Sequence, residues 1–267
     1  MRISALRRKI RNLFKVVLKD PRRKSLFRIL FEYTRFLVTD PIVADQYFYK
    51  YLYIKGANNF GDYKMTRRLR NRCWKLNDDA YASLLNDKYL FELFFSRFGL
   101  SVVRSYAHNI NSLFFIQEKV IQVSTVNEFI DILESLIRDA PETKSLFIKR
   151  TEGSSGGKGI YKISARDLRT KPPRTEGLFH EIIKSGYIIQ EALVQHDMLS
   201  RLNPGCLNTV RIDTFTNRQK ISKIISAFIR LGSGESLVDN VSSGGMYVGI
   251  DINHGNLYAE AHSDFTH

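Results

Sequence analysis

The 267-residue sequence has few cysteines, no long apolar run and no excess of acidic residues. Its two cysteines, Cys73 and Cys206, exclude a disulfide-stapled scaffold and a cysteine-rich zinc site. No apolar stretch approaches the roughly 18 residues that a membrane-spanning helix needs. Arginine and lysine interrupt the first residues from Arg2 onward, which argues against a signal peptide. We therefore expect a cytoplasmic protein.

What the sequence does have is a core-forming composition and one strongly basic end. Hydrophobic residues make up 43% and aromatic residues 12%, which excludes a wholly disordered chain. Residues 1–75 hold 20 Lys and Arg against 5 Asp and Glu, whereas residues 76–267 hold 21 against 22. The net charges of the two parts are therefore +15 and −1. We expect a basic N-terminal region, 1–75, followed by a main domain, 76–267.

The basic region has the pattern of helices. Residues 3–18 alternate apolar and cationic positions with a helical period, and Pro21 is the expected stop. A second stretch, 26–38, is apolar, and a third, 62–76, is again basic. An aromatic cluster lies between them, which we interpret as packing rather than as a base-stacking platform; it comprises Tyr47, Phe48, Tyr49, Tyr51 and Tyr53.

Three interpretations of this charge are open. The helices could pack on the main domain with a solvated basic face. Residues 1–30 could instead lie on an anionic membrane surface, which would place the protein on the inner face of a membrane. A nucleic-acid footprint is disfavoured, because no RNA- or DNA-binding motif accompanies the charge.

Residues 76–267 have a mixed α and β pattern. Asn86 is predicted to cap a helix that ends at Gly99, with Leu90, Phe91, Phe94 and Phe98 facing inward. Thr125 and Glu128 form a capping box that opens a helix ending before Pro141. We further expect a helix at 178–184 and a loop at 170–175. Strands are predicted at 146–149, 159–163, 187–193, 208–216, 221–231, 246–252 and 257–261.

The segment 147–160 carries the clearest chemistry. Lys149 ends a predicted strand, a Gly/Ser-rich loop follows, and Lys158 precedes the return strand. Small residues let backbone N–H groups approach phosphate oxygens, and two lysines supply charge. The same loop could by itself be a flexible hairpin tip. Three other phosphate-binding motifs are excluded by their spacing. A Walker A loop has Ser or Thr after its lysine, but Gly159 follows Lys158, and a Rossmann fingerprint needs a third glycine where Lys162 stands. A protein-kinase glycine-rich loop precedes its strand lysine, whereas Lys149 precedes the loop.

The order of these segments resembles the ATP-grasp superfamily. Glu152-Gly153-Ser154-Ser155 with Gly157 is similar to the phosphate-covering loop of D-alanine–D-alanine ligases. Asn86-Asp87-Lys88 is similar to the site of their first phosphate lysine, and 187–193 to their adenine-reading hinge. The resemblance implies that Gln190 or Glu191 accepts from the adenine amine. The ATP-binding residues it implies are Lys88, Lys149, Glu152, Gly153, Ser154, Ser155, Gly156, Gly157, Lys158, Gln190, Glu191, Ala192, Leu193, His196 and Asn208.

Further motifs narrow the resemblance to the sugar-transfer-associated ATP-grasp family, whose members accompany polysaccharide biosynthesis. They are Gln195-His196, 207–211, 228–232, 238–240 and Gly244-Gly245; their order is also similar to ribosomal-protein glutamate ligases. The resemblance implies that Arg211, Arg230 and Asn240 face the phosphates and the transferred group. His196 would suit the ribose hydroxyls, a role for which Gln195 and Asp197 compete.

The resemblance implies an α+β ATP-grasp fold with two subdomains, 76–185 and 186–267, that enclose ATP. The implied activity is ATP-dependent ligation of an unknown carboxylate to an amine or hydroxyl through an acyl phosphate. The other interpretations are a non-catalytic ATP-binding remnant and a membrane-associated accessory module.

One part of the family pattern is missing. ATP-grasp enzymes bind Mg²⁺ on a terminal strand pair with an Asp and a Glu-x-Asn motif, and the sequence reaches His267 without it. Asp239 with Asn240 comes too early, and Asp251 and Glu260 have no Asn at the right spacing. We therefore assign no metal ligand, expect a C-terminally truncated domain, and expect little turnover.

Overall fold

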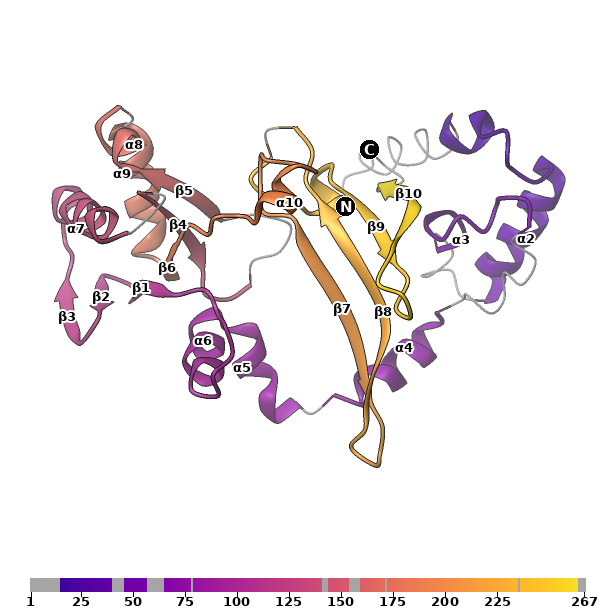
Figure 1. The fold of residues 1–267 in the computed structure, drawn as a ribbon, viewed down its shortest axis with the longest axis horizontal. Helices are drawn as coiled ribbons and strands as arrows, with labels where there is room; N and C mark the ends of the chain where they lie inside the picture. The colour runs from indigo at the N-terminus through magenta and orange to yellow at the C-terminus, as the bar shows by residue number, and fades with distance from the viewer. Residues whose placement is uncertain are drawn as a thin grey trace. The chain divides into compact units, whose positions relative to one another are not determined.

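The computed structural model describes residues 15–39, 46–56, 65–77, 79–140, 144–153, 159–170, 172–234 and 236–263. The chain divides into two compact units (Figure 1). One comprises Met1–Asp78 with His262–His267, and the other, the main unit, is Asp79–Ala261. The division falls close to the change in charge between residues 75 and 76.

The N-terminal unit is helical where it is described. Residues 15–19 are helical, and α2 (Leu26–Thr39), α3 (Gln46–Tyr49) and α4 (Arg67–Trp74) follow. The interpretation of the aromatic cluster as packing is confirmed for Tyr47, Phe48 and Tyr53, which are buried. They form a small core with Val17, Ile29, Phe36 and Leu52. The apolar positions predicted at 3–14 lie outside the described residues. No described helix is long and apolar enough to cross a membrane.

A buried ion pair organises this small core. Lys24 Nζ donates to Glu32 Oε2 at 2.8 Å, and the Tyr47 hydroxyl donates to the same oxygen at 2.7 Å. Burial alone would raise the pKa of Glu32, but hydrogen bonds from Lys24, Tyr47 and Arg28 outweigh burial and hold that pKa below its ordinary value. The carboxylate of Glu32 therefore ties α2 to the segment before it and to α3.

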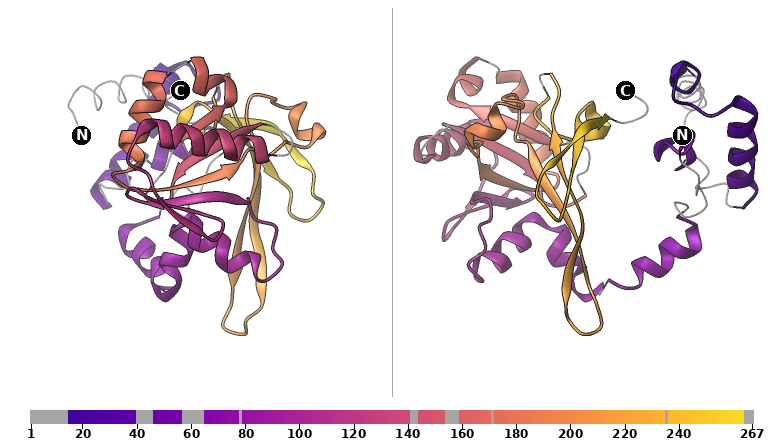
Figure 2. Two further views of the ribbon diagram at one scale, coloured as in Figure 1. Left: turned by 90° about the vertical axis from the view of Figure 1, so that its left-hand side faces the viewer. Right: turned by 45° about the vertical axis from the view of Figure 1, so that its right-hand side comes forward.

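A six-stranded antiparallel sheet forms the first half of the main unit. Its strands are β1 (Ser105–Ile110), β2 (Leu113–Ile116), β3 (Lys119–Gln122), β4 (Ser145–Arg150), β5 (Ile160–Ser164) and β6 (Gly186–Glu191), in the order β3-β2-β1-β6-β4-β5. Three helices, α7 (Val126–Asp139), α8 (Ala165–Thr170) and α9 (Pro172–Ile182), lie on one face of it, and α5 (Ala82–Asn86) and α6 (Lys88–Ser96) lie on the other side (Figures 1 and 2).

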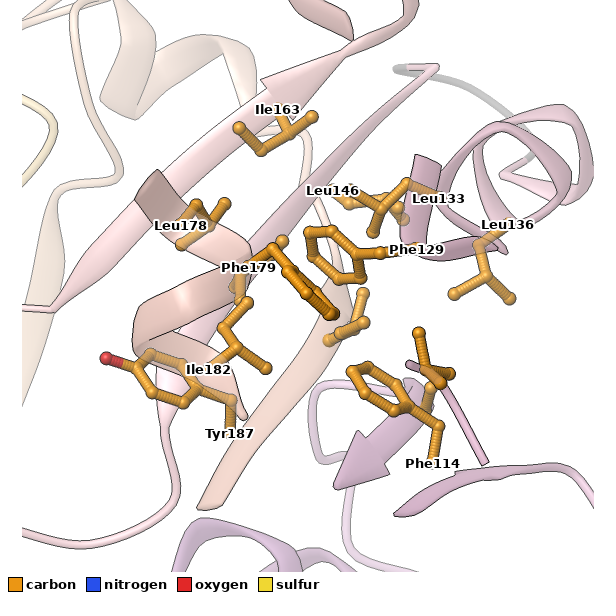
Figure 3. Close-up of a cluster of buried hydrophobic side chains, with 14 of the residues drawn as sticks. Phe114, Phe129, Leu133, Leu136, Leu146, Ile163, Leu178, Phe179, Ile182 and Tyr187 are labelled. Carbon is orange, nitrogen blue, oxygen red and sulfur yellow. The ribbon is translucent and has the colours of Figure 1, made fainter. Parts of the chain in front are cut away.

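The core of the main unit fills the space between this sheet and its three covering helices. Phe129 of α7 packs against Phe179 of α9 and Phe114 of β2, with ring centroids 5.6 and 5.9 Å apart (Figure 3). Leu146 and Ile148 of β4 reach the same core and are fully buried. Because side chains alternate along a strand, Phe147 and Lys149 face the other way.

A second sheet of four strands follows. It contains β7 (Thr209–Thr216), β8 (Ser222–Leu231), β9 (Met246–Ile250) and β10 (Leu257–Ser263), in the order β10-β9-β8-β7. The short helix α10 (Asp197–Ser200) precedes it, and the 3₁₀ turn η3 (Val241–Ser243) connects β8 to β9. The long β7–β8 hairpin extends beyond the other strands of this sheet (Figure 1). The strands predicted at 208–216, 221–231, 246–252 and 257–261 are confirmed, with ends that shift by up to two residues.

Three local predictions are wrong. The cap of α6 is Asp87 and not Asn86, because the extended Asp87 accepts hydrogen bonds from the N–H groups of Tyr89 and Leu90. Leu90, Phe91, Phe94 and Phe98 are exposed rather than inward-facing. The predicted loop at 170–175 is largely helical, because Pro172 and Pro173 begin α9, where a missing N–H costs nothing.

The predicted capping box of α7 is confirmed. Thr125 Oγ1 accepts the Glu128 N–H at 3.2 Å, and Glu128 Oε2 accepts the Thr125 N–H at 3.1 Å. Replacing Thr125 by Ala should lower the free energy of unfolding by about 1 kcal/mol. Urea denaturation followed by circular dichroism measures this loss, and Thr125→Ser should restore most of it. Equal stabilities of all three chains would contradict the role of the cap.

Candidate functional site

A cavity of about 520 Å³ lies in the main unit, and both of its sheets contribute to the lining. Phe147 and Lys149 reach it from β4, and Ile160 and Lys162 from β5. Thr209 and Arg230 reach it from β7 and β8, and Asp239 and Asn240 from the loop before η3. The cavity therefore combines an apolar part with several fixed charges.

The orientation of Lys149 follows from the burial of its neighbour on β4. Ile148 is in the core, so Lys149 projects from the opposite face into the cavity. Its Nζ donates to Gln190 Oε1 at 3.2 Å and lies 5.3 Å from the centre of the Phe147 ring. Burial and the positive charge of Lys88 lower the pKa of Lys149.

Lys88 lies at the base of the glycine-rich loop. Its backbone N–H donates to Thr151 O at 3.1 Å, and its Nζ donates to Arg150 O and Thr151 O at 2.9 and 3.2 Å. The first residue of α6 is thereby joined to the end of β4. Burial lowers the pKa of Lys88 although Asp87 and Glu152 oppose this shift. Lys88 does not line the cavity itself.

Only the two ends of the glycine-rich loop are described. Glu152 and Gly153 are exposed at one end, and Gly159 joins β5 at the other. The predicted phosphate-binding residues Ser154, Ser155, Gly156, Gly157 and Lys158 lie outside the described residues.

Gln190 and Glu191, the two candidates for accepting from the adenine amine, have different surroundings at the end of β6. Gln190 is buried, and its amide bridges Lys149 and the start of β1, with its Nε2 3.4 Å from both Val103 O and Ser105 Oγ. Glu191 lines the cavity together with Ala192 and Leu193, and its Oε1 accepts the N–H of Arg104 at 3.2 Å. After Glu191 the chain leaves the sheet.

The polar residues that follow the hinge have different roles. His196 is exposed and caps α10 by accepting the Met198 N–H at 3.3 Å, whereas its competitors Gln195 and Asp197 line the cavity. Asn208 is buried and does not line the cavity. Its side-chain amide donates to Leu199 O and Asn203 O at 3.0 and 2.9 Å and so holds the loop before β7.

Arg230 is the most firmly held cation of the cavity wall. It lies directly opposite Thr209 in the β7–β8 pair, and its Nη2 donates to Thr209 Oγ1 at 2.9 Å. It also contacts Asp239 Oδ1 at 3.2 Å and donates to Asn240 Oδ1 at 3.1 Å. Asp239 is buried, and its other oxygen accepts from the N–H and hydroxyl of Thr209. The guanidinium group is therefore fixed by three residues.

The glycine pair after η3 makes this arrangement possible. Gly244 has φ +91°, a left-handed conformation that other residues rarely adopt. A Cβ on Gly245 would lie 2.8–2.9 Å from the carbonyl oxygens of Leu231, Asp239 and Asn240, which is too close for any side chain. The two glycines thus let the 239–245 loop fold tightly against the end of β8, beside Arg230.

Arg211 differs from Arg230. It lies two residues after Thr209 on β7 and therefore on the same face of the sheet. Its side chain is exposed and does not line the cavity.

The sequence pattern missed several lining residues, among them Lys162. In the β4–β5 register Lys162 lies opposite Phe147, and Ile160 lies opposite Lys149. Directly paired residues share a face, so knowledge of the register would have found both. The loop of 151–159 is too long for its length alone to fix that register.

Two antiparallel sheets that line one charged cavity, together with a match to a family model, identify an ATP-grasp domain. Residues 67–267 match the family model described as sugar-transfer associated ATP-grasp, and the chain belongs to that family. No curated protein and no solved structure matches the chain.

ATP-grasp proteins generally use ATP with Mg²⁺. The lining of the cavity suits a nucleotide but does not suit a metal ion. Its apolar and cationic parts suit a nucleotide. Among the described residues, no group of three or more acidic, His or Cys side chains could hold a metal ion. The most buried carboxylate of the cavity, Asp239, is engaged by Arg230 and Thr209. The described residues of the cavity therefore do not fit a Mg²⁺ site.

The lowered pKa of the half-buried Lys149 should make the nucleotide affinity of the cavity depend on pH. Because the pKa of Lys149 is lowered, its charge is lost at a lower pH than that of an ordinary lysine. Affinity for a non-hydrolysable ATP analogue should therefore fall as pH rises, before the ordinary lysine range near 10.4 is reached. Isothermal titration across this range measures the fall. Lys149→Arg, which stays charged, should move it to higher pH, and an unmoved profile would contradict the assignment.

Asp239 should contribute both to stability and to nucleotide affinity. Asp239→Asn removes the charge that faces Arg230, and we expect the free energy of unfolding to fall by about 2 kcal/mol. The affinity for the ATP analogue should fall as well, because Arg230 loses its fixed orientation. Asp213→Asn is the matched control, since Asp213 accepts a hydrogen bond from the exposed Ser226 on the same strand pair. Equal effects of the two substitutions would contradict the positioning role.

Proposed function

We propose that the cavity binds ATP and that the protein acts as an ATP-dependent ligase. The single observation that carries the proposal is the shared cavity, where Lys149 from one sheet and Arg230 from the other line the same space as the hinge residues. Family membership supports the general class of activity.

The adenine ring would occupy the apolar part of the cavity. Val103, Phe147 and Ile160 line that part, and Ala192 and Leu193 border it. Backbone groups at a strand end can pair with the edge of a purine in the way they pair with another strand. Glu191 is the hinge carboxylate that lines the cavity, whereas Gln190 would act by orienting Lys149.

The phosphates would be bound by cations from opposite sides. Lys149 supplies a compact charge next to the glycine-rich loop, and Lys162 lies on the same face of the sheet. Lys88 would act mainly by fixing the base of the loop. Arg230 would stabilise the charge that develops on the transferred phosphoryl group, because its guanidinium is oriented before the reaction begins.

The proposed reaction has two steps. A carboxylate oxygen of the substrate attacks the γ-phosphorus, the bond from that phosphorus to the β–γ bridging oxygen breaks, and ADP leaves with the electron pair. An amine or hydroxyl then attacks the acyl carbon, loses a proton and displaces inorganic phosphate. The protein contributes mainly position and electrostatic stabilisation. Asn240, which accepts from Arg230 and lines the cavity, would contact the acyl phosphate. Arg211 would take part only if substrate reaches beyond the cavity.

The family name supports a role connected with sugar transfer, and we propose cell-surface polysaccharide biosynthesis as the setting. The acceptor in that setting would be an amine or hydroxyl of a saccharide or of its carrier. A substrate screen that follows ADP release, with candidate carboxylates and saccharide acceptors in the presence of Mg²⁺, addresses the reaction directly. ADP release that requires both a carboxylate and an acceptor would support ligation.

Nucleotide binding can be tested without a known substrate. The protein should bind a non-hydrolysable ATP analogue saturably, and Lys149→Ala should weaken binding by about 100-fold or more, since it removes a partly buried charge that faces the phosphates. The control is Lys223→Ala, which removes an exposed lysine of β8 and should leave binding unchanged. Equal affinity of Lys149→Ala and the parent chain would overturn the site assignment.

A further inference from the structure

Helix α2 has two apolar faces, and only one of them is used by the core of its unit. Ile29 and Phe36 are buried against the aromatic cluster together with the charged Glu32. The second face is exposed, with Phe27 at 82% and Val38 at 78% of their full accessible surface. The exposed stripe of α2, as we call it, consists of Leu26, Phe27, Leu30, Phe31, Leu37 and Val38.

The spacing of these residues makes one continuous surface. With 100° per residue, the six side chains occupy an arc of about 140° on one side of α2. The buried side chains Ile29, Glu32 and Phe36 lie on the opposite side. Arg28 and Arg35 follow at the edge of the stripe next to Phe31, and both are exposed. Thr34, whose hydroxyl donates to Leu30 O at 2.7 Å, also lies within this arc. Apart from that threonine the surface is apolar along its centre, and it is cationic along one border, where Arg28 also pairs with Glu32.

We propose that the exposed stripe of α2 docks the N-terminal unit on an anionic membrane surface, with α2 lying in the plane of the interface. Fourteen residues give α2 a length of only about 21 Å, and about 30 Å is needed to cross the hydrocarbon layer. A short helix with an apolar stripe and bordering cations is the pattern of an interfacial helix. The apolar side chains would enter the boundary of the acyl chains, and the cations would meet the headgroups.

Charge complementarity favours a membrane over the other possible occupants. Residues 1–75 carry a net charge of +15, so a second copy of this unit would bring like charges together. Residues 76–267 carry −1 and offer no excess of negative charge. An anionic bilayer supplies both an apolar layer and a negative surface. Lys15 and Lys19, exposed on the helical segment before α2, add to the attraction.

Vesicle sedimentation with the full chain tests this proposal. We expect binding to phosphatidylcholine vesicles that contain phosphatidylserine, weak or no binding to phosphatidylcholine alone, and loss of binding at high salt. The double variant Phe27→Ser/Phe31→Ser should bind at least about tenfold more weakly. The double variant Lys15→Gln/Lys19→Gln should lose about fivefold for each cation that lies at the surface.

The matched control removes two phenylalanines from the main unit. Phe98→Ser/Phe215→Ser changes two other exposed rings, at 68% and 48% of their full accessible surface, and should bind the vesicles like the parent chain. Circular dichroism and binding of the ATP analogue show whether each variant is folded, and neither depends on lipid. Because the vesicle assay does not involve the cavity, failure of ATP binding and failure of membrane docking are distinguishable.

Three results would overturn the proposal. The first is an absence of binding to anionic vesicles, and the second is unchanged binding of Phe27→Ser/Phe31→Ser. The third is evidence for another occupant of the stripe. A concentration-dependent dimer that this variant abolishes, without vesicle binding, would assign the stripe to a second copy. A large loss of thermal stability in the same variant, again without vesicle binding, would assign it to the rest of the chain.

Discussion

The alternation of side chains along β4 is the constraint on which the candidate site depends. Leu146 and Ile148 are fully buried, and their burial fixes which face of the strand meets α7 and α9. A shift of one residue would move Lys149 into the core and leave it without solvation. Burial of two aliphatic side chains, worth about 1.5–3 kcal/mol each, thus sets the direction of the lysine beside them. The same register carries Ile160 and Lys162 to the cavity from β5.

Buried polar groups hold the side chains that face the cavity. Gln190 receives the hydrogen bond of Lys149, Asp239 fixes Arg230, and Asn208 ties the loop before β7 to the segment that follows the hinge. All three are buried and hydrogen-bonded, as burial of polar groups requires. Gln190 and Asp239 thereby hold Lys149 and Arg230 in place, and under the proposed function they would do so before a phosphate binds. Reorganisation during the reaction would then cost little.

Features that depend on neighbours along the chain could be predicted from the sequence. The capping box of Thr125 and Glu128 and the strands before and after the glycine-rich loop are of this kind, because each depends on a few consecutive residues. The resemblance also led to Lys149, Glu191 and Arg230, all of which line the cavity. The prediction failed where local signals competed. Asn86 and Asp87 are both good caps, and only the backbone shows which one is extended.

Features that depend on contacts between residues far apart in the sequence could not be predicted from the sequence. Lys162 looked like a residue that breaks a glycine motif, and the strand pairing gives it a place in the cavity wall. Asp239 looked like a misplaced metal ligand, and its contacts with Arg230 and Thr209 give it a different role. The strands β1, β2 and β3 have only six, four and four residues, and β3 is exposed along its whole length, so their sequence carries little periodic pattern.

The distribution of charge separates two kinds of electrostatic interaction in one chain. The cavity belongs to a part of the sequence with almost no net charge, so the phosphate binding that we propose would depend on a few oriented cations rather than on a general field. Partly buried cations of this kind are screened little by salt. The N-terminal unit has the opposite character, because its many exposed cations would act together at the anionic surface that we propose, where charges are screened within about 8 Å at physiological ionic strength. A binding site for a small polyanion needs the first arrangement, since selectivity comes from position. A contact with an extended anionic surface needs only the second, provided that an apolar face such as that of α2 accompanies it.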